Sequence, residues 1–218
     1  MADPYLPALI DFAFDAAEAK VIKSALASAK PWDYKPESAA EVALLKSAKK
    51  KILDLHLKRH GWTCCYCRSN LKGAGPFMTD REHVLPKGKA AYTSLSYTLW
   101  NLAAACKRCN MQFKGSGEGF VIDGTDAAKF PESTNYRFVH PNFDRWEDHF
   151  TRLGIQVNAT NIVKIVRKGS NKAAYAHDFF NLEDFEIDSF DAAQGLENDP
   201  EVSAALFELR KLAKAFGQ

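Results

Sequence analysis

Apolar residues recur at helical spacing in two stretches near the N-terminus. The first covers residues 12–28, where alanines are mixed with larger apolar side chains. After a break at Pro31, Ser38 followed by Glu41 forms a capping box, which predicts the start of a second helix. Its apolar residues fall on one face and its lysines on the other, and Gly61 ends it. We therefore predict that the chain begins with two helices.

Beyond the second helix the pattern changes to short apolar runs, cysteines and glycines. Residues 79–85 form a run short enough to be a β-strand, and residues 99–102 predict a second strand. A helix is expected from about Ala103 onward. Further along, residues 136–139 predict another strand.

The last part of the chain combines a hairpin pattern with a helical one. Residues 154–166 alternate apolar and polar side chains, which predicts a β-hairpin. Asp199 followed by Pro200 indicates the start of a final amphipathic helix that ends at Gly217.

These elements predict an α+β fold in three parts. Residues 1–60 form a helical N-terminal extension, and residues 61–120 form a small central core. Residues 121–218 form a mixed C-terminal extension that ends in the amphipathic helix.

Charge is distributed unevenly along the 218 residues. The net charge is only +2, but residues 44–115 hold fourteen lysines and arginines against three acidic residues, a net charge of +11. The rest of the chain holds fifteen basic and twenty-four acidic residues, a net charge of −9. A basic middle in an otherwise acidic chain favours a polyanion-binding face there, although a solvated lysine-rich helix face is the simpler alternative.

The sequence gives no sign of membrane insertion or export. No apolar run approaches the length needed to span a membrane. The first twenty residues contain four acidic residues and lack a basic start followed by an apolar block. We therefore expect a cytoplasmic, reducing setting and no membrane partner.

Two matched cysteine pairs frame the basic core. Cys64 and Cys67 form one CxxC unit, and Cys106 and Cys109 form the other. Two such pairs can complete a closed tetrahedral zinc site, and four protein ligands leave no position for water, so this Zn²⁺ would be structural. Disulfides are the alternative, which a reducing compartment disfavours. Cys65 is left over, and we interpret it as a small packed side chain.

The residues between and after these pairs carry a second pattern. Glu82-His83-Val84-Leu85-Pro86 is followed by Trp100-Asn101-Leu102, and Asn110 comes directly after the last cysteine, with Lys114-Gly115 behind it. In order and approximate spacing these segments resemble the HNH (ββα-metal) nuclease family in its zinc-clamped form. The resemblance covers about fifty residues, roughly a quarter of the chain. It implies a small zinc-stapled ββα core with flanking α-helical extensions.

Each residue type also suits phosphodiester hydrolysis, which needs an activated water and stabilisation of the developing charge. His83 can accept a proton from water at neutral pH, so it is the candidate general base. Glu82 and Asn110 offer oxygen ligands for a catalytic Mg²⁺ or Mn²⁺, with positions left for phosphate and water. Because neighbouring strand residues point to opposite faces, the strand must end or twist for Glu82 and His83 to face one site.

Further roles follow for the residues around this set. The resemblance assigns Asn101 to hold the loop that carries His83. We expect Lys114, Lys107, Arg108 and Lys87 to contact nucleic-acid phosphates. Taken singly, a histidine on a strand or an asparagine before an apolar residue is usually structural, but their joint placement within the cysteine frame favours a catalytic site. The chain departs from the family pattern in having Glu82 where many members have aspartate, and Asn110 in place of histidine.

A segment downstream of the core is dense in potential ligands, among them His140, Asp144 and His149. It is loosely similar to a segment in HNH proteins of bacterial anti-phage systems of the Septu and retron-associated type, which are paired with an ATPase. The simpler interpretation is a loop that packs Phe143 and Trp146 on the core. The roles of the three potential ligands stay open.

We therefore predict a metal-dependent endonuclease that hydrolyses DNA, most simply double-stranded DNA, to 5′-phosphate and 3′-hydroxyl ends, as the resemblance implies. The helices of residues 1–60 and 200–217 would be docking surfaces for a partner, because the core does not require them. One alternative is a zinc-ribbon module that binds nucleic acid without catalysis. Another is a nuclease subunit gated by an ATPase partner. RNA stays open as a substrate.

Overall fold

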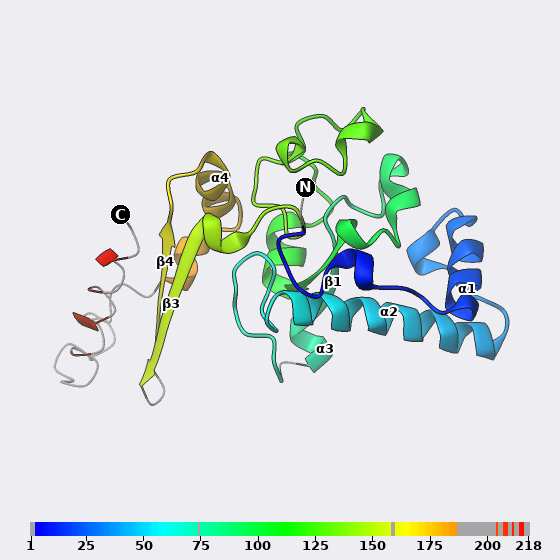
Figure 1. Cartoon of the computed structure of the whole chain (residues 1–218), viewed down its shortest axis with the longest axis horizontal. Coiled ribbons are helices and arrows are strands. Elements are labelled where there is room, and N and C mark those ends of the chain that lie inside the picture. Colours follow the sequence, from blue (N-terminus) through cyan, green and yellow to red (C-terminus); the bar gives the residue numbers. More distant parts are fainter. Residues whose placement is uncertain are drawn as a thin grey trace. The chain divides into compact units, whose positions relative to one another are not determined.

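The structure is a computed structural model, shown in Figure 1. It describes residues 3–73, 75–157 and 160–186, together with 204, 207–208, 211 and 214–215. The chain is a mixed α+β protein and divides into two compact units, Met1–Arg145 and Trp146–Gln218. The boundary between the units falls within residues 121–218, which the sequence predicted as a single C-terminal extension. The predicted helix after Pro200 lies largely outside the described residues. None of the helices formed by the described residues is long and apolar enough to cross a membrane.

The first unit begins with the two predicted helices. Helix α1 (Ala16–Leu26) is shorter than predicted, because Asp15 caps its N-terminus in a reciprocal capping box with Glu18. Helix α2 (Ala39–Arg59) starts after Ser38, whose hydroxyl accepts the backbone N–H of Glu41 at 3.2 Å. The two helices pack against each other and form most of one apolar core with Tyr97 and Leu102.

Strands β1 (Thr79–His83) and β2 (Leu102–Cys106) form an antiparallel pair that follows the short helix α3 (Gly75–Met78). Thr79 lies opposite Cys106 and His83 opposite Leu102. Helix α2 packs on β2, whose five residues are all buried. The pair therefore has a cysteine at one end and the candidate base at the other.

Two predicted strands are wrong in position or extent. Residues 99–102 mostly form a 3-10 turn, Leu99–Asn101, and the strand begins at Leu102. Residues 103–105 are alanines, which favour helices locally, but pairing with β1 and close packing under α2 override that preference. The helix begins only at Arg108. Residues 136–139 contribute an isolated bridge between Tyr136 and Val121 and no full strand.

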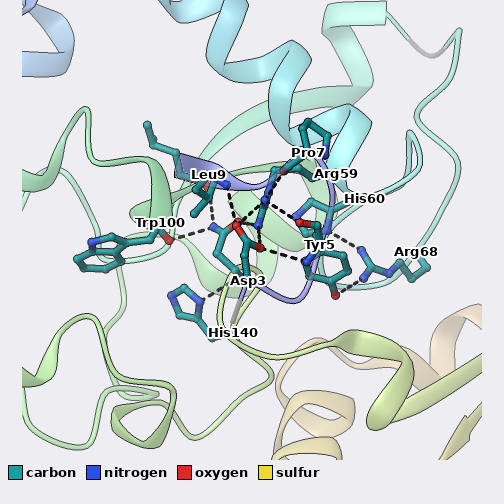
Figure 2. A network of polar contacts seen from close by, with 11 residues as sticks. Asp3, Tyr5, Pro7, Leu9, Arg59, His60, Arg68, Trp100 and His140 are labelled. Atoms are coloured by element: carbon teal, nitrogen blue, oxygen red, sulfur yellow. Dashed lines mark hydrogen bonds and ion pairs between the residues drawn. The ribbon is translucent and has the colours of Figure 1, made fainter. Parts of the chain in front are cut away.

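The N-terminal segment is tied to the end of α2 by a buried cation. The Arg59 guanidinium, whose side chain is fully buried, donates to both carboxylate oxygens of Asp3 at 2.8 and 2.9 Å and to the carbonyl of Pro7 at 2.6 Å (Figure 2). Close by, Arg68 donates to the Tyr5 hydroxyl at 2.7 Å and lies 3.1 Å from His60 Nδ1. This network fixes residues 3–9 against the rest of the first unit.

Asp3→Asn is expected to lower the free energy of unfolding by about 3 kcal/mol, the cost of leaving a buried cation without its carboxylate. Thermal and urea unfolding followed by circular dichroism measure the change. Asp126→Asn is the matched control, because the ion pair of Asp126 with Lys129 is half-exposed and its loss should change stability little. Equal small changes in both variants would show that the Asp3 contact contributes no more than a surface pair.

The second unit contains the predicted β-hairpin. Strands β3 (Phe150–Val157) and β4 (Thr160–Arg167) pair antiparallel, with Phe150 opposite Arg167. Helix α4 (Asn171–Phe179) starts at the cap residue Ser170, and it packs against β4. Aromatic and aliphatic side chains close the core of this unit, including Trp146, Phe150, Val163, Ile165, Phe180 and Leu182.

Candidate functional site

Four of the five cysteines form a cluster with the geometry of a metal site. The Sγ atoms of Cys64, Cys67, Cys106 and Cys109 all lie within 4.8 Å of one another, and all four residues are buried. The Cys67 and Cys106 sulfurs are 3.8 Å apart, which is the edge of a tetrahedron with zinc–sulfur bonds of about 2.3 Å and far longer than a disulfide bond of about 2.05 Å. The cluster can therefore hold a metal ion such as zinc, whereas Cys65 is buried beside it and takes no part.

Burial disfavours the ionised form of the Cys64 thiol. It raises the pKa of the Cys64 thiol well above its usual value, because a buried anion loses its hydration. The turn that carries Cys64 and Cys67 is also joined to β2, since the backbone N–H of Cys65 donates to the carbonyl of Ala104 at 2.9 Å. The cluster thus links the first cysteine turn to the strand pair.

A cleft of about 650 Å³ opens at the other end of the strand pair. Its walls come from three parts of the first unit: residues 29–33 between α1 and α2, the end of β1 with the loop that follows, and residues 110–116. Glu82, His83, Asn110 and Lys114 all line it. The predicted site residues of β1 and of the segment after the second cysteine pair therefore meet at one cavity.

His83 is the last residue of β1 and is held in one orientation. Its Nε2 donates to the backbone carbonyl of Ser96 at 3.1 Å, and the Trp32 ring packs edge-on against the imidazole with centroids 4.5 Å apart. Burial lowers the pKa of His83 to about 4, so the imidazole is neutral at pH 7. With the proton on Nε2, the lone pair lies on Nδ1, which has no hydrogen-bond partner in the described part of the chain.

Asn110 is anchored in the same manner. It lies in a π-helical segment, Arg108–Lys114, and its Nδ2 donates to Asp80 Oδ2 at 3.1 Å. Its Oδ1 accepts no hydrogen bond from any described residue. Asp80 was missed by sequence reasoning, although its position two residues before Glu82 places both carboxylates on one face of β1.

Glu82 is a fully buried carboxylate with one satisfied oxygen. Its Oε1 accepts a hydrogen bond from the Tyr66 hydroxyl at 2.9 Å and lies 3.1 Å from the ammonium of Lys114. Its Oε2 is buried and has no hydrogen-bond partner among the described residues. Such an atom is costly unless a cation reaches it. Burial also lowers the pKa of Lys114 to about 8, which still leaves the ammonium mostly charged at pH 7.

Asn101 joins the two ends of the loop after β1. Its Oδ1 accepts the backbone N–H of Leu85 at 2.7 Å, and its Nδ2 donates to the carbonyls of Leu85 and Leu95 at 3.2 and 3.4 Å. Ser96, whose carbonyl orients His83, comes directly after Leu95 in the sequence. Asn101 therefore lies where it can hold the loop that carries the candidate base.

The linker between the two N-terminal helices contributes to this cleft, although the sequence placed it in an extension outside the core. Residues 29–33 line the cleft, and Trp32 contacts His83 directly. This loop is fixed by a hydrogen bond from Lys49 Nζ to the Trp32 carbonyl at 2.6 Å and by one from the Tyr97 hydroxyl to the Pro31 carbonyl at 3.3 Å. No local pattern in the sequence places residue 32 beside residue 83, so this contact was missed.

Of the four residues predicted to contact phosphates, Lys114 is buried and the other three are partly exposed. Lys114 is buried, and its ammonium lies 3.1 Å from Oε1 of Glu82. Lys87 lines the cleft at its surface and pairs with Asp33 at 2.7 Å. Lys107 is partly exposed, 3.6 Å from Asp80, and the Arg108 guanidinium lies over the Phe113 ring at 4.3 Å.

The downstream segment uses its polar groups internally. His140 Nδ1 accepts the backbone N–H of Asn142 at 3.1 Å, and Asp144 accepts the backbone N–H of His140 at 2.7 Å. Phe143 stacks on His140 with centroids 4.1 Å apart, in keeping with a packed loop. His149 lies in the second unit and contacts Ser170 Oγ at 2.6 Å. Within the described residues, the cysteine cluster is the one group of three or more such ligands close enough to share an ion.

No protein-family model matches this chain, and a search of curated proteins finds no match either. The function has to be inferred from the geometry of the cleft and of the cysteine cluster.

Proposed function

We propose that this protein is a metal-dependent nuclease of the HNH (ββα-metal) type that hydrolyses phosphodiester bonds, with DNA as the expected substrate. The active site would be the cleft between residues 29–33 and residues 110–116, and the cysteine cluster would hold a structural zinc. The resemblance in sequence motivates this proposal, and the arrangement of three side chains in the cleft supports it.

The observation that carries the proposal is a shared pattern, in which one polar atom of each side chain is held and the other is unpaired. Each of His83, Glu82 and Asn110 has one polar atom fixed by the protein, and in each the second atom has no partner among the described residues. All three side chains line the same cleft. A packed structural role would satisfy both atoms of each group, whereas a reaction site needs each group oriented with one atom left unpaired for a ligand.

The donors fit a hard divalent cation. The Oε2 of Glu82 and the Oδ1 of Asn110 are oxygen ligands of the kind that Mg²⁺ and Mn²⁺ prefer, and two protein ligands leave positions for phosphate and water. When bound, the cation would supply Lewis-acid stabilisation of the charge that develops on the phosphate and on the departing oxygen.

The chain's own residues would perform the remaining steps. The neutral His83 would accept through Nδ1 the proton of the attacking water, while the Ser96 carbonyl stabilises the imidazolium that forms by accepting from Nε2. Attack on phosphorus would break the bond to the 3′-oxygen, which takes a proton from solvent, and would leave 5′-phosphate and 3′-hydroxyl ends. Lys30, Arg81 and Lys87 line the cleft and would bind neighbouring phosphates.

Supercoiled plasmid incubated with the protein tests the proposal. We expect nicking with Mg²⁺ or Mn²⁺ and none with excess chelator. Glu82→Gln should slow nicking by more than about tenfold, the lower end of the loss seen when a group that only supports a metal ligand is replaced.

Glu132→Gln is the matched control, because Glu132 is exposed and lies outside the cleft, and it should nick at the wild-type rate. Single-stranded DNA and RNA of the same sequence establish the substrate class. If the wild-type protein binds these nucleic acids but cuts none of them with either cation, the protein is a zinc-stabilised binding module and the nuclease proposal is wrong.

A further inference from the structure

We infer that Tyr66 is a positioning residue that connects the cysteine cluster to the carboxylate of the cleft. This inference rests on the proposed function, since it concerns how Glu82 is prepared to hold the catalytic cation. Tyr66 lies between Cys64 and Cys67, two members of the cluster. Its hydroxyl reaches Glu82, which lies in the candidate site on a different element.

The contact selects one of the two carboxylate oxygens. Tyr66 donates to Oε1 of Glu82 at 2.9 Å, and Lys114 lies against the same oxygen at 3.1 Å. Oε2 is left without a hydrogen-bond partner among the described residues, although it is buried. With both donors on one oxygen, the carboxylate cannot rotate without breaking two charge-assisted contacts, and Oε2 is the oxygen left for the cation.

The turn that carries the first cysteine pair also fixes the position of Tyr66. Cys64 and Cys67, two positions before it and one after it, belong to the cluster, and the backbone N–H of Cys65 donates to the carbonyl of Ala104 on β2. Ala103, the neighbour of Ala104, lies opposite Glu82 in the strand pair. The Tyr66 ring also packs edge-on against Phe138, with centroids 5.6 Å apart. Contacts of the backbone around Tyr66 and of its ring therefore both hold the hydroxyl against Glu82.

The cysteine cluster thus acts on the cleft beyond stabilising the fold. Zinc bound to the cluster would fix the turn. The turn places the Tyr66 hydroxyl against Oε1 of Glu82, which leaves Oε2 as the ligand for a catalytic cation. Residues that only support a metal ligand through a hydrogen bond typically change metal affinity by about 10- to 100-fold.

Tyr66→Phe tests this inference, because it removes the hydroxyl and keeps the ring that packs on Phe138. Mn²⁺ affinity is measured by titration with electron paramagnetic resonance of the free ion, together with the Mn²⁺ concentration that gives half-maximal plasmid nicking. We expect both to show binding weakened about tenfold. Zinc content should stay at the wild-type value, and saturating Mn²⁺ should restore most of the turnover.

Tyr136→Phe is the matched control. Tyr136 is also buried, and its hydroxyl donates to the carbonyl of Phe130 at 2.6 Å, so this variant loses a buried hydrogen bond that does not involve Glu82. It should lose stability and keep the wild-type Mn²⁺ affinity. If the wild-type protein binds Mn²⁺ and nicks DNA while Tyr66→Phe binds Mn²⁺ equally well, or if both variants weaken binding equally, the positioning role is wrong. A wild-type protein that neither binds Mn²⁺ nor cuts overturns the proposed function and this role with it.

Discussion

Replacing His83 by alanine is expected to slow phosphodiester cleavage by about 10²- to 10⁴-fold, the range that a general base contributes. The reason is geometric, because Nε2 is occupied by the Ser96 carbonyl and Nδ1 is the ring atom left for a water. Nucleic-acid affinity should change little, since the side chain carries no charge at pH 7 with its pKa lowered by burial. Plasmid nicking under saturating Mg²⁺ and fluorescence anisotropy of labelled DNA measure the two quantities.

Two further variants separate loss of the base from loss of structure. His177→Ala changes a histidine of the second unit and should cut at the wild-type rate. Imidazole added to His83→Ala should restore part of the activity, because the substitution leaves a space in the cleft wall beside Trp32. Unchanged nicking by His83→Ala, with zinc content and circular dichroism as in wild type, would show that another group activates the water.

Features marked by local chemistry could be predicted from the sequence. The start of α2 follows from Ser38 and Glu41, whose capping contacts lie three residues apart. The cysteine cluster follows from two CxxC pairs, because that spacing lets two sulfurs approach one point. The hairpin of β3 and β4 follows from the alternation of apolar and polar residues over much of residues 154–166.

Features that depend on contacts between distant segments could not be predicted. Residues 103–105 are alanines and carry no strand signal of their own, so only pairing with β1 makes them a strand. Trp32 reaches His83 across fifty-one positions of sequence, and nothing near either residue indicates the contact. Lys114 was predicted to contact phosphates, and nothing in the sequence indicates that its ammonium lies against the buried carboxylate of Glu82, where it serves as the counterion.

Loss of the cysteine cluster should have the largest effect on stability. Cys64→Ser removes one of four thiolates, and we expect the first unit to lose zinc and its cooperative unfolding transition. Structural zinc contributes about 10–16 kcal/mol of binding free energy in zinc-finger peptides, which matches or exceeds the total stability of about 5–15 kcal/mol of an ordinary domain. Zinc content by elemental analysis and thermal unfolding by circular dichroism measure the loss.

Cys65→Ser provides a control one residue away. Cys65 is as buried as Cys64 but lies outside the cluster, so its replacement should keep one zinc per chain and lower stability only modestly. The comparison isolates metal binding from the cost of placing a hydroxyl in the interior, because both variants make the same chemical change in the same turn. Since Tyr66 in that turn holds Glu82, Cys65→Ser should also keep its Mn²⁺ affinity. A Cys64→Ser protein that retains stoichiometric zinc and wild-type unfolding would show that the four sulfurs do not act as one metal site.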